Sequence, residues 1–232
     1  MAYRLFTANR NYSSWSLRPW VLMRMLGIGF EEVAQVFAAG SNRAAFRAFA
    51  PNGTVPCLHD GEVVVWDSLA IVEYLAERHG GVWPADARAR AWARCAAAEM
   101  HGGFSALRNT CSMNCGLRVT LHEVGPALAQ DIARIDELWC EGLARSGGPF
   151  LGGAAFTAVD AFFAPVAFRA QGYGLAFSAP AAGYVARLLA LGPMREWYDA
   201  ALLETAREPG HEAEAAAAGT IVADLRVPVS GA

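Results

Sequence analysis

Lysine is absent from this chain of 232 residues, so its basic side chains are arginines and five histidines. Charged residues make up only 18%, and the net charge of −3 leaves no basic excess for nucleic acid or an acidic membrane. No apolar run reaches the roughly 20 residues of a membrane span. Residues 3–7 are amphipathic and lack the pattern of a secretory signal. We therefore expect a soluble, cytoplasmic protein that binds neither nucleic acid nor membrane.

Cysteine is also scarce. The five cysteines show no CxxC motif and no zinc-site spacing, so we expect reduced thiols and no metal site. Cys111 and Cys115 could share a helix face as a redox pair, but two small buried hydrophobic residues are the interpretation that we favour. Cys57, just after Pro56, is a second candidate for a redox thiol, and there too we favour the non-redox interpretation.

The first 80 residues alternate between strand and helix patterns. Asp60-Gly61 between two apolar runs is a strong hairpin signal. Strands are expected at 3–7, 30–37, 56–59 and 63–66, and helices at 15–26, 41–49 and 68–78. The order βαβ then ββα predicts an α/β domain over residues 1–80 with a mixed four-stranded sheet.

Beyond Gly80-Gly81 the strand signals vanish and alanine-rich helical patterns take over. Thr157-x-x-Asp160 is similar to a capping box and opens a very apolar helix. Helices are expected at 85–108, 126–145, 157–169, 181–191 and 193–206. We predict an all-helical bundle domain over residues 85–207, and residues 208–232 as a tail that is partly disordered or lies on the surface.

Two short motifs in the first domain indicate a site that binds a peptide. A proline at the first position of a strand cannot donate to the ladder, and an X-Pro bond can be cis at a cost of only about 0.5–1 kcal/mol. Val55, before Pro56, would then be free to pair its backbone with a ligand. Further along, Ser68 is a good N-cap whose helix N-terminus suits a carboxylate, and Asp67 can hold an ammonium group.

With the all-helical part opened by Thr157 and Asp160, this arrangement resembles the cytosolic glutathione transferases over roughly residues 3–205. The resemblance implies a thioredoxin-like N-terminal domain, glutathione as co-substrate and a homodimer. It also implies that Val55, beside a cis Pro56, pairs with the cysteinyl part of glutathione. Asp67 and Ser68 would hold the γ-glutamyl end.

The resemblance offers a basic residue for the third end of glutathione. Family members often place a basic or amide residue after the second strand, against the glycyl carboxylate. Arg43 or Arg47 could take this role here.

The loop that carries Ser13 and Ser14 resembles the serine-type members of the family, of the zeta or theta kind. A hydroxyl that donates to sulfur at the positive end of a helix favours the thiolate, which is the nucleophile. The zeta spacing favours Ser13 as the catalytic residue, and the theta-like spacing favours Ser14. The structural alternative for one of them is an N-cap of the first helix.

A second pocket should accept the electrophile. His101, Phe104 and Arg108 lie on nearby turns of the helix expected at 85–108 and are candidates to line it. Arg108 could also hold an anionic substrate, although an arginine between helices or at the dimer interface is the structural alternative.

The sequence therefore predicts a glutathione transferase that activates the thiol of glutathione for attack on a small apolar electrophile, as in detoxification. Two alternatives remain: a maleylacetoacetate-type, glutathione-dependent isomerase, and a non-catalytic binding or regulatory protein that kept the scaffold. Trp15 stands where zeta members often have cysteine, which disfavours the isomerase.

Overall fold

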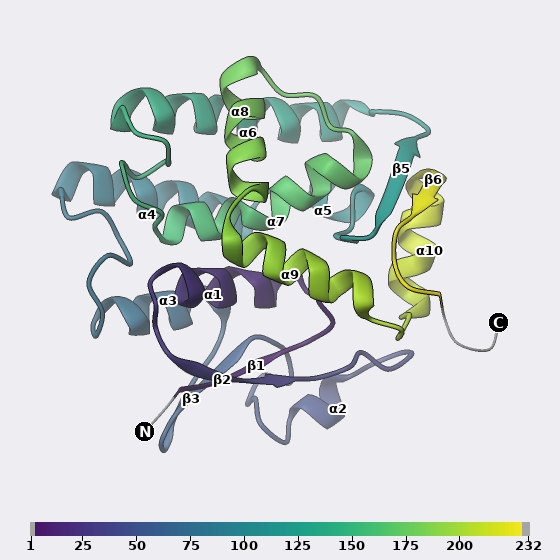
Figure 1. The fold of residues 1–232 in the computed structure, drawn as a ribbon, viewed down its shortest axis with the longest axis horizontal. Helices are drawn as coiled ribbons and strands as arrows, with labels where there is room; N and C mark the ends of the chain where they lie inside the picture. The colour runs from purple at the N-terminus through teal and green to yellow at the C-terminus, as the bar shows by residue number, and fades with distance from the viewer. Residues whose placement is uncertain (1–2, 229–232) are drawn as a thin grey trace.

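A mixed four-stranded sheet organises the N-terminal part of the chain (Figure 1). In the computed structural model, which describes residues 3–228, the strands are β1 (Tyr3–Thr7), β2 (Phe30–Ala34), β3 (Cys57–Asp60) and β4 (Val63–Val65). Their order in the sheet is β2-β1-β3-β4. β1 is parallel to β2 and antiparallel to β3, which is antiparallel to β4. The mixed sheet expected from the sequence is confirmed.

Three helices belong to this sheet: α1 (Ser14–Met25), α2 (Arg43–Phe46) and α3 (Ser68–Ala76). α1 and α3 cover the face that looks toward the rest of the molecule, and α2 lies on the other side (Figure 1). Gly27 has a φ of 65° just after α1, a left-handed conformation that glycine adopts without strain. The helix therefore ends where the sequence predicted.

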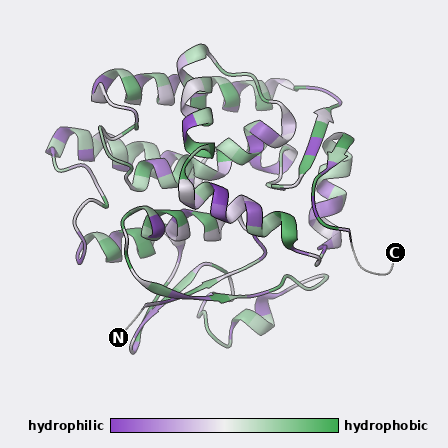
Figure 2. Ribbon diagram, in the orientation of Figure 1, coloured by the Kyte–Doolittle hydropathy of each residue, from purple (hydrophilic) through white to green (hydrophobic). Residues whose placement is uncertain are grey.

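The larger helical part is built around α7 (Ala158–Tyr173), which is buried along almost its whole length. A helix that is apolar on all sides must have protein all around it, and α7 packs against α1, α4 and α8. Figure 2 shows the surrounding helices striped in purple and green, as expected for amphipathic helices that cover a core. They are α4 (Ala87–Gly102), α6 (Pro126–Ser146), α8 (Ala179–Leu189) and α9 (Gly192–Leu203).

Asp160 anchors the start of α7. The predicted capping box is present: Thr157 N donates to Asp160 Oδ2 at 2.9 Å. The same buried carboxylate accepts from Leu151 N at 2.9 Å and from the Tyr184 hydroxyl at 2.7 Å. Burial raises the pKa of Asp160 to about 6 although these donors favour its charged form. The group holds the 151–157 turn and α8 to α7.

The expected single helix over residues 85–108 is wrong. The chain breaks after α4, and a short α5 (Ser105–Thr110) follows. At Gly103 a Cβ would lie 2.7 Å from the carbonyl oxygen of Glu99, and Phe104 has a φ of 58°. The Gly102-Gly103 pair is the signal that marks this break.

The expected C-terminal helical bundle is confirmed, but it is not all-helical. The described residues of the expected tail form regular structure with a largely exposed strand, so the tail is ordered and lies partly on the surface. β5 (Leu117–Leu121) pairs antiparallel with β6 (Gly219–Asp224), and α10 (Pro209–Ala218) connects β6 to the bundle (Figure 1, yellow). A Cβ at Gly219 would lie 2.2 Å from the carbonyl oxygen of Thr120, so only glycine permits this close pairing. Residues 229–232 of the predicted tail lie outside the described part.

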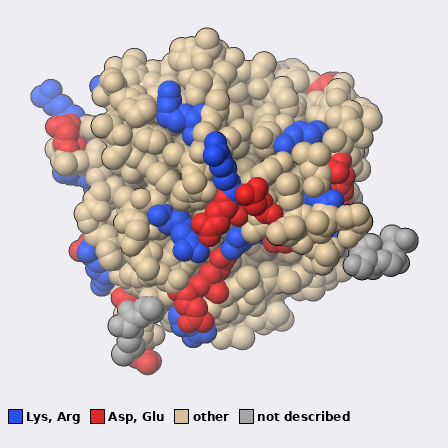
Figure 3. Space-filling model, viewed as in Figure 1, with Lys and Arg blue, Asp and Glu red and all other residues tan. Residues whose placement is uncertain are grey.

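Charged side chains of both signs mix on the face shown in Figure 3, where they gather over α9. An ion pair joins Arg24 of α1 to Glu196 of α9 at 3.2 Å. No helix among the described residues is both long and apolar enough to cross a membrane.

We predict that Asp160→Asn lowers the free energy of unfolding by about 2–4 kcal/mol, because the amide leaves several buried donors without an acceptor. The measurement is denaturant unfolding at neutral pH. Asp86→Asn is the matched control: Asp86 caps the exposed start of α4, where asparagine caps equally well, so the loss should stay below about 1 kcal/mol. Equal losses in both variants would contradict the structural role of Asp160.

Candidate functional site

A cleft of about 450 Å³ lies between the sheet part and the helical part. The start of α1 forms its base, residues 37–55 form one wall, and the helical part with α10 forms the other. Five of the predicted site residues line it, namely Ser13, Ser14, Arg43, Val55 and Arg108. Pro56, Asp67, Ser68, His101 and Phe104 are not among its lining residues.

The two serines make different hydrogen bonds. Ser13 Oγ donates to Ser16 Oγ at 2.7 Å, so its proton is engaged within the protein. Ser14 Oγ accepts from Arg169 Nη2 at 3.4 Å, which leaves its own proton free for a ligand. Ser13 occupies the N-cap position of α1, but its side chain makes no capping hydrogen bond. Neither hydroxyl therefore caps the helix.

Arg169 is a site residue that the sequence analysis missed. It belongs to α7, lines the cleft and donates through Nε to the carbonyl oxygen of Cys111 at 2.8 Å. Burial lowers the pKa of Arg169 to about 10, with a further contribution from the positive charge of Arg108. A single arginine inside an apolar helix was the signal that could have revealed it.

The loop before the serines is held from the helical part. Glu204 accepts from Arg10 N at 2.6 Å and from Asn11 N at 3.1 Å. The Asn11 side chain donates to the carbonyl oxygen of Ala201 at 2.6 Å and accepts from Gly116 N at 3.2 Å. The position of the serines therefore depends on residues almost 200 positions away.

Val55 presents an unpaired backbone to the cleft. The Val55–Pro56 peptide bond is cis, and β3 begins only at Cys57. Among the described residues, neither the N–H nor the carbonyl oxygen of Val55 makes a hydrogen bond. Gly53, with a φ of 69°, packs so tightly against Arg43 that a Cβ would lie 2.7 Å from that residue's Cγ. This close approach brings Arg43 and Val55 to the same wall.

The start of α3 differs from the prediction in one respect. Asp67, not Ser68, is the N-cap, because its carboxylate accepts from Leu69 N at 2.9 Å. Ser68 is the first helical residue, and its hydroxyl is buried with no hydrogen-bond partner among the described residues. An unpaired buried hydroxyl beside a carboxylate is costly unless a ligand completes it.

His101 and Phe104 lie away from the cleft. His101 Nε2 is 3.2 Å from Asp67 Oδ2, and its ring meets Trp15 edge-on. Its pKa is lowered, mainly by burial, against the attraction of Asp67. Phe104 is buried in the core at the break before α5. Neither residue therefore lines the pocket wall on which it was expected.

Arg108 lines the cleft and also joins two helices. Its guanidinium donates to the carbonyl oxygens of Met100 and His101, the latter at 2.9 Å, and lies 4.8 Å from the centre of the Trp15 ring. Burial lowers its pKa. From the sequence, a place in the substrate pocket and a contact between helices were alternatives for Arg108. In the structure Arg108 does both.

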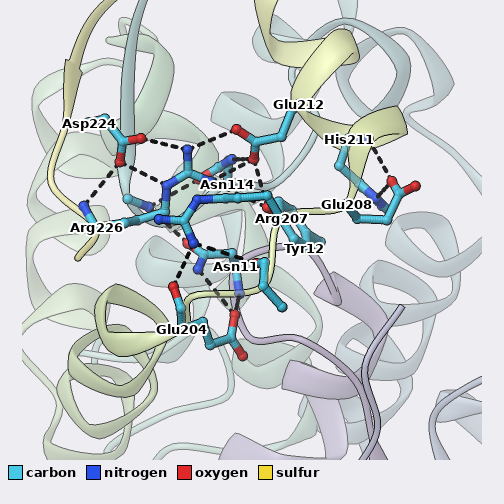
Figure 4. Close-up of polar contacts among 12 residues, drawn as sticks. Asn11, Tyr12, Asn114, Glu204, Arg207, Glu208, His211, Glu212, Asp224 and Arg226 are labelled. Carbon is cyan, nitrogen blue, oxygen red and sulfur yellow. Dashed lines mark hydrogen bonds and ion pairs between the residues drawn. The ribbon is translucent and has the colours of Figure 1, made fainter. Parts of the chain in front are cut away.

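α10 forms part of the cleft wall through His211 and Glu214. The ring of His211 stacks between Tyr12 and Phe37, at centroid distances of 4.8 and 5.5 Å. Figure 4 shows the polar network behind it: Glu212 accepts from the Tyr12 hydroxyl at 2.7 Å and pairs with Arg226. His211 Nδ1 lies 2.7 Å from Glu208. The sequence analysis placed none of these tail residues at the site.

The cysteines lie outside the chemistry of the cleft. All five thiols are free, and burial raises the pKa of Cys57 to about 11 and that of Cys111 to about 12. Such thiols stay protonated near neutral pH and are poor nucleophiles. Among the described residues, no group of three or more His, Cys, Asp or Glu side chains could hold a metal ion.

The chain is similar to known proteins in both of its parts. The N-terminal domain model of glutathione S-transferase matches residues 12–78, and the C-terminal domain model matches residues 117–200. A curated zeta-class glutathione S-transferase from Euphorbia esula is 31% identical over 126 residues, 53% of this chain and 56% of that protein. The match thus spans little more than half of that relative's length.

Solved structures share the fold at low identity. A theta-class glutathione S-transferase from Xanthomonas axonopodis pv. citri, solved with glutathione bound, has a TM-score of 0.64 at 22% identity and covers 85% of this chain and 97% of its own. A Tau-class enzyme from mango, Mangifera indica, has a TM-score of 0.65 at 19% identity, with 94% and 97% covered.

We predict that Arg226→Gln loosens the C-terminal segment. Its buried guanidinium pairs with Glu212 at 2.6 Å and Asp224 at 2.7 Å, and removing it leaves the half-buried Glu212 carboxylate unpaired. Amide hydrogen exchange across α10 and β6 should become roughly 10- to 100-fold faster, and exchange in α7 should not change. The exposed Arg195→Gln serves as control. Unchanged exchange in α10 would refute the anchoring role of Arg226.

Proposed function

Because the chain belongs to the glutathione S-transferase family, we propose that it binds glutathione in this cleft and holds the thiolate with the hydroxyl of Ser14. The observation that carries the proposal is the difference between the serines: Ser14 retains a free proton beside Arg169, whereas Ser13 donates to Ser16.

Two residues that line the cleft, and two at the start of α3 that do not line it, fit the groups of glutathione. Val55 offers an unpaired N–H and carbonyl oxygen to the cysteinyl backbone. Ser68 offers a buried hydroxyl without a partner, and Asp67 beside it a carboxylate for the γ-glutamyl end. Arg43 lines the same wall and suits the glycyl carboxylate. Glutathione supplies the sulfur nucleophile, whose electron pair forms a new S–C bond to an electrophilic carbon. The bond from that carbon to the leaving group breaks, and the leaving group departs to solvent with the bonding electron pair.

Ser14 and Arg169 favour the ionised thiol by two physical effects. The sequence slightly favoured Ser13 for this role, and the proposal assigns it to Ser14 because of the hydrogen bonds above. The Ser14 hydroxyl donates to the sulfur at the N-terminus of α1, where the helix dipole is positive. The Arg169 guanidinium adds a full positive charge that polarises this hydroxyl. A charge-assisted hydrogen bond that stabilises the thiolate by about 1.5–3 kcal/mol would lower the pKa of the glutathione thiol by about one to two units. The thiol proton leaves to solvent.

The assembly and the location of the protein are part of the same proposal. Val63 and Trp66 are exposed apolar side chains at the edge strand β4, which supports a homodimer through this side. The five free cysteines suit the reducing cytoplasm. A transferase of this kind would act in the detoxification of electrophiles.

Replacing the two serines separately tests which hydroxyl acts. Ser14→Ala should lower turnover about 10- to 100-fold and raise the pKa of bound glutathione by one to two units, with little change in affinity. Ser13→Ala should change turnover by less than about threefold, since its proton serves Ser16. Ultraviolet absorbance of the thiolate across pH measures the shift. A larger effect for Ser13→Ala would assign the role to Ser13 instead.

Ser68→Ala should weaken glutathione binding about 10- to 100-fold in a calorimetric titration, because one hydrogen bond to a carboxylate is lost. Turnover at saturating glutathione should stay close to that of the unmodified protein. The control is Ser105→Ala, an exposed serine of α5, for which the Kd should not move. If Ser68→Ala binds glutathione normally, the γ-glutamyl end lies elsewhere.

A further inference from the structure

Three arginines converge behind and beside Trp15, at the base of the cleft. Arg18 lies 4.1 Å from the Trp15 ring centre, Arg108 lies 4.8 Å from the same ring, and Arg169 donates to Ser14 next to it. Burial lowers the pKa of each, and Arg108 lowers the pKa of the other two further. The charges are therefore close enough to repel one another.

Little negative charge balances this cluster. Asp67 is the carboxylate that attracts Arg18, but it also caps α3 and pairs with His101. Asp131 attracts Arg108 while accepting a hydrogen bond from Leu107 N. None of the three arginines forms an ion pair with a carboxylate among residues 3–228.

Several guanidinium donors also lack a partner. In the described part of the chain, Nε and Nη1 of Arg18 and Nε of Arg108 are buried without a hydrogen bond. No hydrogen bond is found for Nη1 of Arg169 in the same residues, although the side chain is only 5% exposed and lines the cleft. Buried cations with open donors are strongly unfavourable unless an anion joins them.

We propose that the helical side of the cleft binds an anionic group, so that the electrophile is a carboxylate-bearing compound held between Arg108 and Arg169. The inference rests on the proposed function and narrows it: the small electrophile expected from the sequence carries a carboxylate, and Arg169 joins Arg108 in binding it. Trp15 and Met113 line the same region and can contact the apolar body of that compound. Arginine suits a carboxylate because its planar donors match the two oxygens.

The carboxylates of glutathione do not account for these arginines. Its γ-glutamyl and glycyl ends are assigned to Ser68 and Arg43, which belong to the sheet part. Arg108 and Arg169 come from α5 and α7 in the helical part. The thiolate of glutathione would be held by the Ser14 hydroxyl, which leaves Arg108 and the free Nη1 of Arg169 for an anion on the second substrate.

A matched pair of glutathione conjugates tests the inference without requiring turnover. S-(4-carboxy-2-nitrophenyl)glutathione and its carboxamide analogue differ in one charged group, and calorimetry gives the Kd of each beside that of glutathione. The carboxylate conjugate should bind at least tenfold more tightly than the amide. Equal or weaker binding of the carboxylate overturns the inference and leaves glutathione binding intact. No binding of glutathione itself overturns the proposed function and the inference together.

Variants then locate the anion. Arg108→Gln should reduce the carboxylate-to-amide preference at least fivefold while glutathione itself binds as before. Arg118→Gln is the matched control, because Arg118 is also half-buried, donates to two carbonyl oxygens and packs on an aromatic ring, but lies outside the cleft. An unchanged preference in Arg108→Gln, or an equal loss in Arg118→Gln, overturns the assignment.

A third variant changes the preference in the opposite direction and does not touch the arginines. Glu214 is an exposed acid on the cleft wall formed by α10. Glu214→Gln removes a negative charge that repels an incoming carboxylate, so the carboxylate conjugate should bind about two- to fivefold more tightly at low salt, with the amide unaffected. Weaker binding of the carboxylate in this variant contradicts an anion site.

Discussion

The carboxylate of Glu204, at the end of α9, is the contact on which the site depends. It accepts the backbone N–H groups of Arg10 and Asn11, in the loop that leads to the serines. Trp197, about two turns earlier on α9, donates to the carbonyl oxygen of Arg10 at 2.9 Å. A loop of this length has many conformations, and ordering it costs entropy that these contacts must exceed. The reactive hydroxyls thus lie in the N-terminal part of the sequence, but the loop that positions them is held by hydrogen bonds from the helical part.

The helical part also places positive charge at the base of the cleft, through Arg169 of α7. α7 is buried along almost its whole length, so Arg169 can reach solvent only through the cleft. Its donors can reach only a carbonyl oxygen at Cys111, the hydroxyl of Ser14 and the cleft itself. A charge placed at such a position destabilises the empty protein and strengthens interactions with a bound anion, since few waters screen it. Arg169 therefore lowers the stability of the empty protein and at the same time strengthens the binding of an anion in the cleft.

The parts of the fold that local patterns control could be predicted from the sequence. The Asp60-Gly61 hairpin, the end of α1 at Gly27 and the capping box at Thr157 each depend on neighbours a few residues apart. β5 and β6 pair across about 100 residues, and their short β-branched runs are too weak to reveal a partner so distant. Arg169 and His211 reach the cleft only through tertiary packing. No spacing in the sequence connects them to the serines, so these residues were missed.

The C-terminal segment gives this chain a cleft wall that lies outside the matched family domains, which end at residue 200. It is integrated into the fold: β6 pairs with β5, and Arg226 is buried between two carboxylates. The ring of His211 stacks between those of Tyr12 and Phe37, which belong to the sheet part. Because Tyr12 directly precedes the serines, any shift of α10 is transmitted to the reactive loop through the Tyr12–Glu212 hydrogen bond. The width of the cleft and the position of its hydroxyls are therefore set together, by a segment that the matched family domains do not include.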